Sequence, residues 1–358
     1  MSKPYYPPAK IACITGANSM DGKTLALILL NKGYEVILTY RRNTFFNQLN
    51  IINQLEITHS ELLRSKLHFE TCEITDQNSV NTCIRNIISK FGKLDELYMI
   101  AAMSHVGNSF SQKEYSILAN GQSYYYFLEA VKNLWRKCRV YGALTSELAG
   151  EVSDGTIFDE QTPWHPKSPY SIGKALGGHW IQFYRESLDS QLFCCYGILF
   201  NHSNTFRSKD FFTRKLTNTA ARITLGKEKV LKLGNLEFSR DEHWSDFGCE
   251  MMWKMLQNCT PKNYVIGTGK TYSGEEYLNE VFDYFNLKWS DYVKFDENLI
   301  RPNEVERLVA DSSLAQKDLG WRPDRMSFKQ QIQLLCQYDL ELEKGNKPAR
   351  PNVFELFL

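Results

Sequence analysis

The sequence has no hydrophobic run of about 18–20 residues, which is the length that a membrane-spanning helix requires. Its first ten residues are polar and contain proline, and they lack the apolar segment of a secretion signal. We therefore expect a cytoplasmic protein that has no membrane partner.

An excess of charge of one sign is also lacking. Lysine and arginine number 42, aspartate and glutamate number 41, and the formal net charge is +1. This balance predicts no broad basic surface for nucleic acid, so any phosphate binding must be local. The hydrophobic content of 43% is typical of a globular protein, and 358 residues suffice for a large domain with a smaller one.

The nine cysteines lack the CxxC or Cys/His spacing of a metal site. Cys194 and Cys195 are adjacent in an apolar run that predicts a strand. We expect reduced thiols and no bound metal.

Short apolar runs alternate with helical patterns in the first part of the chain. We expect strands at residues 11–14, 35–39, 67–72, 97–101, 140–144 and 193–199, and helices at residues 24–30, 80–91, 123–135 and 174–187. This alternation predicts an α/β fold with a doubly wound, parallel Rossmann-type sheet. It becomes less regular after about residue 200. We therefore expect residues 1–200 to form the sheet domain and residues 201–358 to form mainly a smaller mixed lobe, with segments such as 264–266 returning to the sheet.

The first strand and the first helix are joined by a turn that runs from Gly16 to Gly22. Backbone N–H groups in such a turn, together with a helix N-terminus, bind the pyrophosphate of a dinucleotide. The usual fingerprint has three glycines, and here Ser19 stands at the middle position. We predict that Gly16, Ser19, Met20, Asp21 and Gly22 contact a cofactor. An ordinary strand-to-helix connection is the alternative.

The end of the second strand distinguishes between the two nicotinamide cofactors. An NAD site places a carboxylate there for the ribose 2′-hydroxyl, whereas an arginine suits the 2′-phosphate of NADP. The sequence has Arg41 and Arg42 at this point and no acid, so it predicts NADP. Glu73, Ile74 and Asp76 follow the third strand. We expect Glu73 and Asp76 at the adenine end of the cofactor, and Ile74 among the cofactor-binding residues. A loop with helix-capping acids is the alternative there.

Tyr170 and Lys174 are spaced four residues apart, which places them on one face of a helix. A nearby cation favours the phenolate, so such a tyrosine serves as general base for an alcohol hydroxyl. Upstream, Thr145 and Glu147 add a hydroxyl and a carboxylate that a plain alcohol dehydrogenase does not need. The alternative is a surface tyrosine beside a solvated lysine, with Thr145 and Glu147 at a helix N-terminus.

Ordered blocks of residues extend from about Ile11 to about Trp321. They are Thr15-Gly16 to Asp21-Gly22, Tyr40-Arg41-Arg42, Ser104-His105-Val106, Thr145-Ser146-Glu147-Leu148, Ser168-Pro169-Tyr170, Gly197 to His202, Phe212-Thr213-Arg214-Lys215, Leu233-Gly234-Asn235-Leu236, Arg240-Asp241 and Arg301 to Val305. With these blocks the chain resembles the extended short-chain dehydrogenase/reductases and, among them, the GDP-mannose 4,6-dehydratases.

The resemblance implies a lyase that uses NADP without net oxidation. Tyr170 would take the proton of the sugar C4 hydroxyl while hydride leaves C4, and Lys174 would hold the cofactor ribose and lower the pKa of the phenol. Glu147, assisted by Thr145, would remove the C5 proton and pass it to the leaving C6 hydroxyl. Hydride would then return to C6.

The resemblance also implies the contacts of a GDP-sugar. Arg240 and Arg301 would clamp its pyrophosphate, since a guanidinium forms bidentate, charge-assisted bonds. Glu304 would accept hydrogen bonds from ribose hydroxyls. Further substrate contacts would come from Ser104, Asn201, Arg214 and Lys215, and Ala101 would lie near the nicotinamide.

Departures from the family pattern lie near the sugar and the cofactor. Ala101-Ala102-Met103 stands for a glycine-alanine-glutamine run, Leu144 replaces a small hydroxyl residue, and the segment after Arg240-Asp241 is one residue shorter. They leave open a GDP-heptose 4,6-dehydratase, a GDP-sugar 4-dehydrogenase or epimerase, or a nucleotide-binding scaffold without activity.

The resemblance further implies that the loop after the second strand reaches the cofactor site of a neighbouring subunit. Phe45 and Phe46 follow the paired arginines there, and their exposure on a free turn would be unfavourable. We therefore predict a homo-oligomer, a dimer or a tetramer. Packing of both rings onto their own domain is the alternative.

Overall fold

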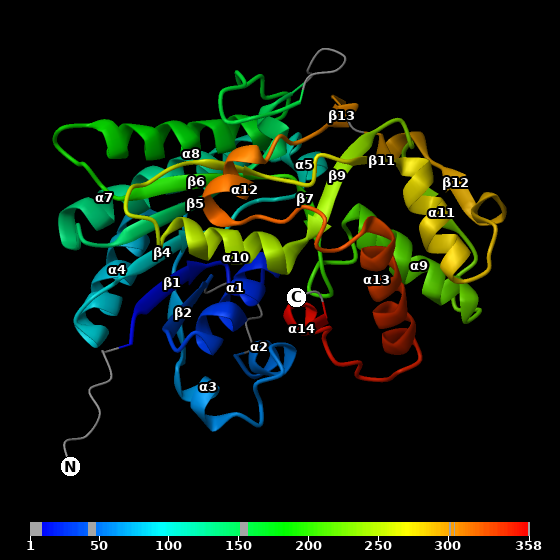
Figure 1. Cartoon of the computed structure of the whole chain (residues 1–358), viewed down its shortest axis with the longest axis horizontal. Coiled ribbons are helices and arrows are strands. Elements are labelled where there is room, and N and C mark those ends of the chain that lie inside the picture. The colour runs from blue at the N-terminus through cyan, green and yellow to red at the C-terminus, as the bar shows by residue number, and fades with distance from the viewer. Residues whose placement is uncertain (1–8, 42–47, 151–156, 301, 304, 357–358) are drawn as a thin grey trace.

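The computed structural model describes residues 9–41, 48–150, 157–300, 302–303 and 305–356. In these residues a parallel sheet of seven strands has the order β10-β6-β5-β4-β1-β2-β3 (Figure 1). The strands are β1 Ile11–Thr15, β2 Glu35–Tyr40, β3 Leu67–Thr71, β4 Glu96–Met99, β5 Arg139–Thr145, β6 Cys194–Leu199 and β10 Tyr264–Ile266. The predicted doubly wound parallel sheet is confirmed, and the strand at 264–266 returns to it beside β6.

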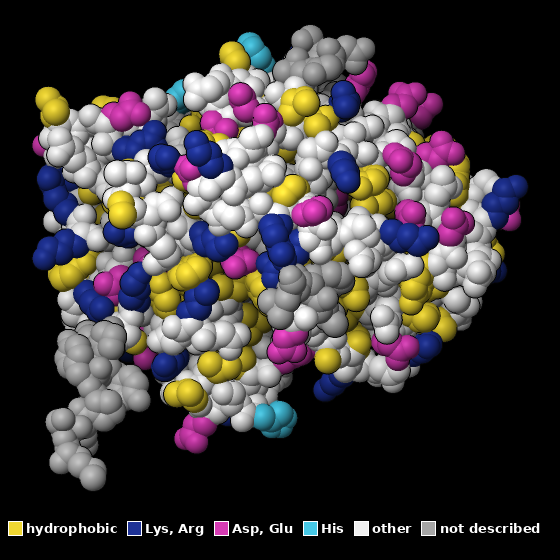
Figure 2. Space-filling view, viewed as in Figure 1, with side chains coloured by type: hydrophobic (Ala, Val, Ile, Leu, Met, Phe, Trp, Pro, Cys, Tyr) yellow, Lys and Arg dark blue, Asp and Glu magenta, His cyan; other side chains and the backbone are white. Residues whose placement is uncertain are grey.

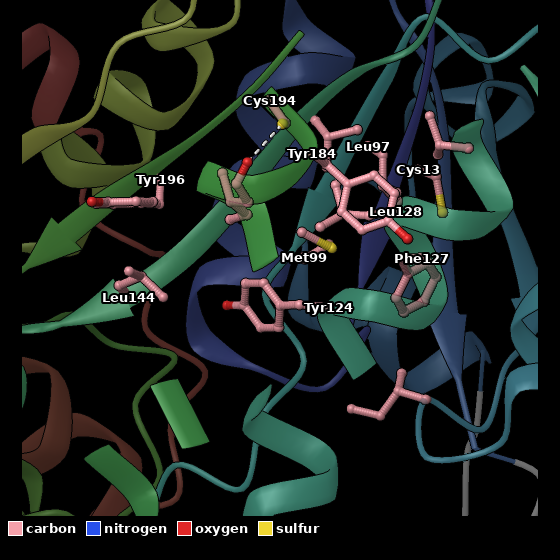
Figure 3. Close-up of a cluster of buried hydrophobic side chains, with 14 of the residues drawn as sticks. Cys13, Leu97, Met99, Tyr124, Phe127, Leu128, Leu144, Tyr184, Cys194 and Tyr196 are labelled. Carbon is pink, nitrogen blue, oxygen red and sulfur yellow. Dashed lines mark hydrogen bonds between the residues drawn. The ribbon is translucent and has the colours of Figure 1, made fainter. Parts of the chain in front are cut away.

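Helices cover both faces of this sheet. One face carries α4 Gln77–Phe91, α7 Ser123–Leu134 and α8 Pro169–Glu186, and the other carries α1 Met20–Asn31, α10 Ser245–Met255 and α12 Ser313–Leu319. Side chains of one strand alternate between two cores, so Cys13 packs with the first group while Ala12 and Ile14 pack with the second. Figure 3 shows Cys13 in the first core together with Leu97 and Phe127.

Side-chain caps set where two of these helices begin. Ser19 caps α1 by accepting a hydrogen bond from the Gly22 N–H. Helix α8 has a capping box between Ser168 and Ser171, with Pro169 at its first position. Both helices therefore begin four or five residues before the predicted starts at residues 24 and 174.

The C-terminal part adds a lobe with its own small sheets. Strand β9 Ser239–Trp244 lies between β11 Thr271–Ser273 and β13 Arg307–Leu308 and also pairs with β7 Asn201–Ser203, while β8 Leu231–Leu233 pairs with β12 Val293–Phe295. Helices α9 Phe212–Thr224, α11 Gly274–Tyr284 and α13 Phe328–Glu343 enclose its core.

Short elements complete the described part of the chain. They are α2 Gln48–Gln54, α3 Glu61–Ser65, α5 Val106–Ser109, α6 Lys113–Ile117, a π-helix η1 Leu118–Gln122, the 3₁₀ turns η2 Ser146–Leu148, η3 Trp289–Asp291 and η4 Glu297–Leu299, and α14 Val353–Leu356.

The surface mixes charges of both signs, as Figure 2 shows for one face. None of the helices in the described ranges is long and apolar enough to cross a membrane. The cysteines are free thiols, and all but Cys259 are buried.

Candidate functional site

Two adjoining cavities lie where the strands of the main sheet end. The turn cavity, of about 400 Å³, is lined by the β1–α1 turn and by the end of β2. The central cavity, of about 380 Å³, extends from the end of β5 to β9 of the lobe. The two share part of their lining, which consists of Asp21, Ile100, Ala102, Ser104, Arg207 and Phe211. An extended ligand in one cavity can therefore reach a ligand in the other.

The β1–α1 turn is tight and leaves no room for a side chain at two of its glycines. Gly16 has φ +89°, and a Cβ there would lie 3.2 Å from the Cα of Ala101. A Cβ on Gly22 would lie 2.4 Å from the carbonyl oxygen of Gly16. The Ser19 hydroxyl donates to that carbonyl at 2.8 Å and accepts from the Gly22 N–H at 2.9 Å. Ser19 thus closes the turn and caps α1, and Gly16, Ser19 and Met20 line the turn cavity as predicted cofactor residues.

The other predicted cofactor residues divide into two groups. Arg41 lines the turn cavity and donates from Nη1 to the Tyr115 hydroxyl at 2.8 Å, and Ile74 and Ala101 also line it. Glu73 does not, because its carboxylate accepts from the backbone and the hydroxyl of Thr75. Asp76 does not line it either, and its side chain caps α4 by accepting from the Asn78 N–H. The structure therefore favours the alternative of a loop with a helix-capping acid for Glu73 and Asp76. Arg42 lies outside the described residues.

The four predicted catalytic residues all line the central cavity. Thr145 ends β5, and its hydroxyl accepts from the Glu147 N–H at 3.2 Å, which caps η2 and places Glu147 beside it. Tyr170 is the second residue of α8, and Lys174 follows one turn later. The two predicted bases, Glu147 and Tyr170, thus meet where η2 follows the end of β5 and where α8 begins.

The electrostatics of Tyr170 differ from the sequence-based expectation. Burial raises the pKa of Tyr170 to about 12, with a further increase from the charge of Glu147, while Thr145 and Arg207 act to lower it. Lys174 instead donates to the Ala143 carbonyl at 2.7 Å, and burial lowers its own pKa to about 7. Arg207 is the cation whose charge acts to lower the pKa of Tyr170 in this structure, and the expected effect of Lys174 on Tyr170 stays a prediction.

Arg207 is a residue that sequence reasoning missed. Its guanidinium lies 3.6 Å over the Phe211 ring, and it lines both cavities. Its Nε is buried and has no hydrogen-bond partner in the described part of the chain. Burial lowers its pKa, although the charges of Asp21 and Glu242 oppose this. A guanidinium held this way is available to an anionic ligand, but nothing in the sequence distinguishes it from any loop arginine.

Asp21, predicted to contact the cofactor, anchors a second cation. His202 places Nδ1 2.7 Å from the Phe200 carbonyl and Nε2 3.0 Å from the Asp21 carboxylate. Both partners are acceptors, which favours a proton on each ring nitrogen, and the charge of Asp21 raises the pKa of His202 against the effect of burial. Burial alone would raise the pKa of Asp21, but His202 and the Ser245 hydroxyl lower it to about 2. His202 also lines the central cavity and was missed as a site residue.

Only some of the predicted substrate residues line a cavity in the described part of the chain. Ser104, Asn201, Lys215 and Arg240 line the central cavity. Arg240 donates to the carbonyls of residues 239 and 306, at 3.0 and 3.2 Å. Arg301 and Glu304 lie outside the described residues.

Arg214 does not line either cavity, and its predicted substrate contact is not supported. Its guanidinium pairs with Asp339 at 2.5 and 3.1 Å and donates to the Thr205 carbonyl at 2.6 Å. Both charged side chains are buried, with 2% and 0% exposed. Arg214 therefore ties α9 to α13, and Lys215, the next residue, faces the cavity instead.

Known proteins are similar to this chain over nearly its whole length. The model of the family described as GDP-mannose 4,6 dehydratase matches residues 13–335. GDP-mannose 4,6 dehydratase 2 of Arabidopsis thaliana is 38% identical, covering 95% of this chain and 89% of its own. GDP-mannose 4,6 dehydratase of Homo sapiens is 35% identical, covering 96% and 94%.

Solved structures share the fold at lower identity. A dTDP-glucose 4,6-dehydratase of Streptomyces venezuelae, solved with NAD, superposes with a TM-score of 0.79 at 20% identity, over 94% of this chain and 99% of that one. RMD from Pseudomonas aeruginosa, complexed with NADPH, gives a TM-score of 0.74 at 16% identity, over 94% and 100%.

Proposed function

The chain belongs to the GDP-mannose 4,6-dehydratase family, and from that premise we propose that it converts GDP-mannose into GDP-4-dehydro-6-deoxy-mannose with the loss of water. The observation that carries the proposal is the meeting of Thr145, Glu147, Tyr170 and Lys174 in one cavity. A simple 4-dehydrogenase or epimerase needs no base for C5, so Glu147 beside Thr145 favours elimination over those alternatives.

The turn cavity fits a nicotinamide dinucleotide. Gly16 and Gly22 let the β1–α1 turn close tightly, because a side chain at either would collide with Ala101 or with the Gly16 carbonyl. The N-terminus of α1 then supplies backbone N–H groups for a pyrophosphate. A nicotinamide cofactor bound there would supply the hydride acceptor for the sugar C4 and the hydride donor for C6. We assign this cofactor to residues 1–200 and the GDP-sugar mainly to residues 201–358.

The protein's own groups act in a defined order. Tyr170 takes the proton of the C4 hydroxyl, supported by Arg207 and Thr145. The Glu147 carboxylate and the Tyr170 phenolate repel each other, and the charge of Glu147 therefore raises the pKa of Tyr170. Once Tyr170 has taken its proton, Glu147 is the remaining base; it removes the C5 proton and delivers it to the C6 hydroxyl, which leaves as water. The return of hydride to C6 then requires a proton at C5, and Tyr170 holds the one that it took from the C4 hydroxyl.

The substrate fits the other half of the site. Arg240 and Lys215 are the cations for the diphosphate, and Asn201 adds a polar contact. Incubation of the protein with GDP-mannose and NADP, followed by detection of a 4-keto sugar, tests the proposal. A GDP-heptose assayed in parallel decides between hexose and heptose, and absence of a keto product from both refutes a dehydratase.

We propose NADP over NAD because Arg41 lines the turn cavity at the end of β2. Arg41→Ser should weaken NADP binding by roughly tenfold and leave NAD binding within about twofold, since the 2′-phosphate alone distinguishes the two. Isothermal titration with both cofactors measures this. Equal losses would show that Arg41 does not read the phosphate.

We also propose that the protein is a cytoplasmic homo-oligomer. Phe45 and Phe46 lie outside the described residues, but helix α8 offers a second surface. Ile172 and Phe183 are 48% and 55% exposed, and their spacing of three helical turns puts both on one face. A second copy of the chain, related by a twofold axis, would cover this face with its own.

A further inference from the structure

Besides Glu147, the central cavity is lined by carboxylates that the proposed reaction does not use, and Glu242 is one of them. Glu242 lies in β9, is 3% exposed and lines the cavity beside Thr213 and Tyr277. It falls in the segment after Arg240-Asp241, where the sequence departs from the family pattern by one residue.

The strand geometry places Glu242 on the same side of β9 as Arg240, facing the central cavity. Arg240 and Glu242 are two residues apart and both line the cavity, while Asp241 between them bonds the backbone of Thr268 and Gly269. In the parallel pairing of β7 with β9, Glu242 stands opposite Asn201. Two residues of strand carry Glu242 roughly 6–7 Å from the diphosphate cation Arg240.

The direction of β9 decides which end of the ligand Glu242 meets. The strand leads from Arg240 to Trp244, and the next residue, Ser245, donates to the Asp21 carboxylate at 2.8 Å. The charge of Glu242 also acts on Arg207, which in turn acts on Tyr170. Glu242 therefore lies along β9 between Arg240, the proposed diphosphate cation, and the end of the strand that reaches Asp21.

Neutral hydroxyls hold the carboxylate in place. Oε2 accepts from the Tyr277 hydroxyl at 2.7 Å, and Oε1 accepts from the Thr213 hydroxyl at 3.4 Å. A carboxylate has about four acceptor positions, so about two remain for other donors. A buried carboxylate with unused acceptors is costly, and a ligand rich in hydroxyl donors compensates for it.

Building on the proposed function, we infer that Glu242 determines sugar specificity: it accepts a hydrogen bond from a hydroxyl of the glycosyl group of a neutral GDP-sugar. Its negative charge disfavours GDP-sugars that carry a carboxylate. Tyr277 is the positioning residue that fixes the carboxylate in the cavity wall.

Binding to GDP, GDP-mannose and a GDP-hexuronate tests the inference by isothermal titration. Glu242→Gln should weaken GDP-mannose by about tenfold, leave GDP within about twofold, and strengthen the GDP-hexuronate. Tyr277→Phe should shift GDP-mannose in the same direction by a smaller factor. The matched control is Glu237→Gln, an exposed carboxylate of the preceding segment, which should change none of the three affinities.

Several results would overturn the inference. Equal losses for GDP and GDP-mannose in Glu242→Gln would show that the residue supports the lobe and does not contact the sugar. Unchanged affinities in Glu242→Gln would show that Glu242 does not contact the sugar. A wild type that binds GDP-mannose and a GDP-heptose no more tightly than GDP would show the same. A protein that discriminates through Glu242 but forms no keto product would refute only the proposed reaction.

Discussion

At the scale of single residues, the charges around Tyr170 are coupled. The carboxylate of Glu147 raises the pKa of this phenol and the guanidinium of Arg207 lowers it, so a change at either position alters the base. This coupling makes the order of proton transfers testable, because C4 oxidation and C5 deprotonation use different groups.

Glu147→Gln should separate the two steps. C4 oxidation should continue, and reduced cofactor should accumulate and be visible by its absorbance, but C5 should exchange no deuterium from solvent. Loss of the negative charge should also move the pH profile of C4 oxidation to lower pH, because Glu147 raises the pKa of Tyr170. In the matched variant Tyr170→Phe, turnover should fall by at least about 100-fold and no reduced cofactor should accumulate. Deuterium exchange at the wild-type rate in Glu147→Gln would identify another base.

Lys174 should make the stability of the ligand-free protein depend on pH. Burial lowers its pKa from 10.5 to about 7 in the folded protein, so between these values the unfolded chain binds the extra proton. The free energy of unfolding should therefore rise with pH across this window, and the destabilisation should be complete below about pH 7. Lys174→Met should be more thermostable than the wild type, by a larger margin at about pH 6.5 than at about pH 10. Thermal unfolding at the two pH values measures this, and an equal margin would contradict it.

At the scale of elements, α9 presents two neighbouring cations to different surroundings. Arg214 is enclosed by Asp339 of α13, whose carboxylate also accepts from the Thr217 hydroxyl at 2.6 Å, whereas Lys215 lines the central cavity. Arg214→Ala should cost about 3–5 kcal/mol of stability, because it leaves the Asp339 charge buried and unpaired. Lys215→Ala should change stability by about 0.5 kcal/mol or less and weaken GDP-sugar binding. Denaturant unfolding and titration with GDP-mannose compare the two; weaker binding without destabilisation in Arg214→Ala would reverse the assignment.

The same helix shows why the sequence predicts elements better than contacts. Apolar periodicity located the strands and helices, since it reflects burial along one element. Helix α8 begins at Pro169 and not at residue 174, because the capping box between Ser168 and Ser171 extends the helix beyond its apolar pattern. The adjacent Arg214 and Lys215 could not be told apart, because the difference comes from Asp339, which is distant in the sequence.

At the scale of the whole molecule, the site depends on segments that only the fold unites. Thr145, Glu147, Tyr170 and Lys174 were predicted because they occur in ordered blocks near one another in the chain. Arg207 stacks on the Phe211 ring and lines both cavities. The Asp21–His202 pair joins α1 to β7. Such partners carry no local pattern, so the sequence did not reveal them.

The outer face of α8 provides the last test, which concerns assembly. Ile172 and Phe183 are exposed on the side of the helix opposite the buried Tyr170 and Lys174, and Phe183 lies edge-on to Trp180 with ring centroids 6.1 Å apart. Burying such apolar surface contributes about 25 cal/mol per Å², and a twofold axis would bury both copies at once. Ile172→Ser with Phe183→Ser should therefore shift the protein toward a monomer of 41.5 kDa in light scattering. Leu188→Ser, which changes a 90% exposed leucine beyond the end of α8, is the matched control and should leave the assembly state unchanged.

A wild type that is already monomeric at working concentrations would refute the proposed oligomer. An oligomer that persists in the double variant would place the interface elsewhere.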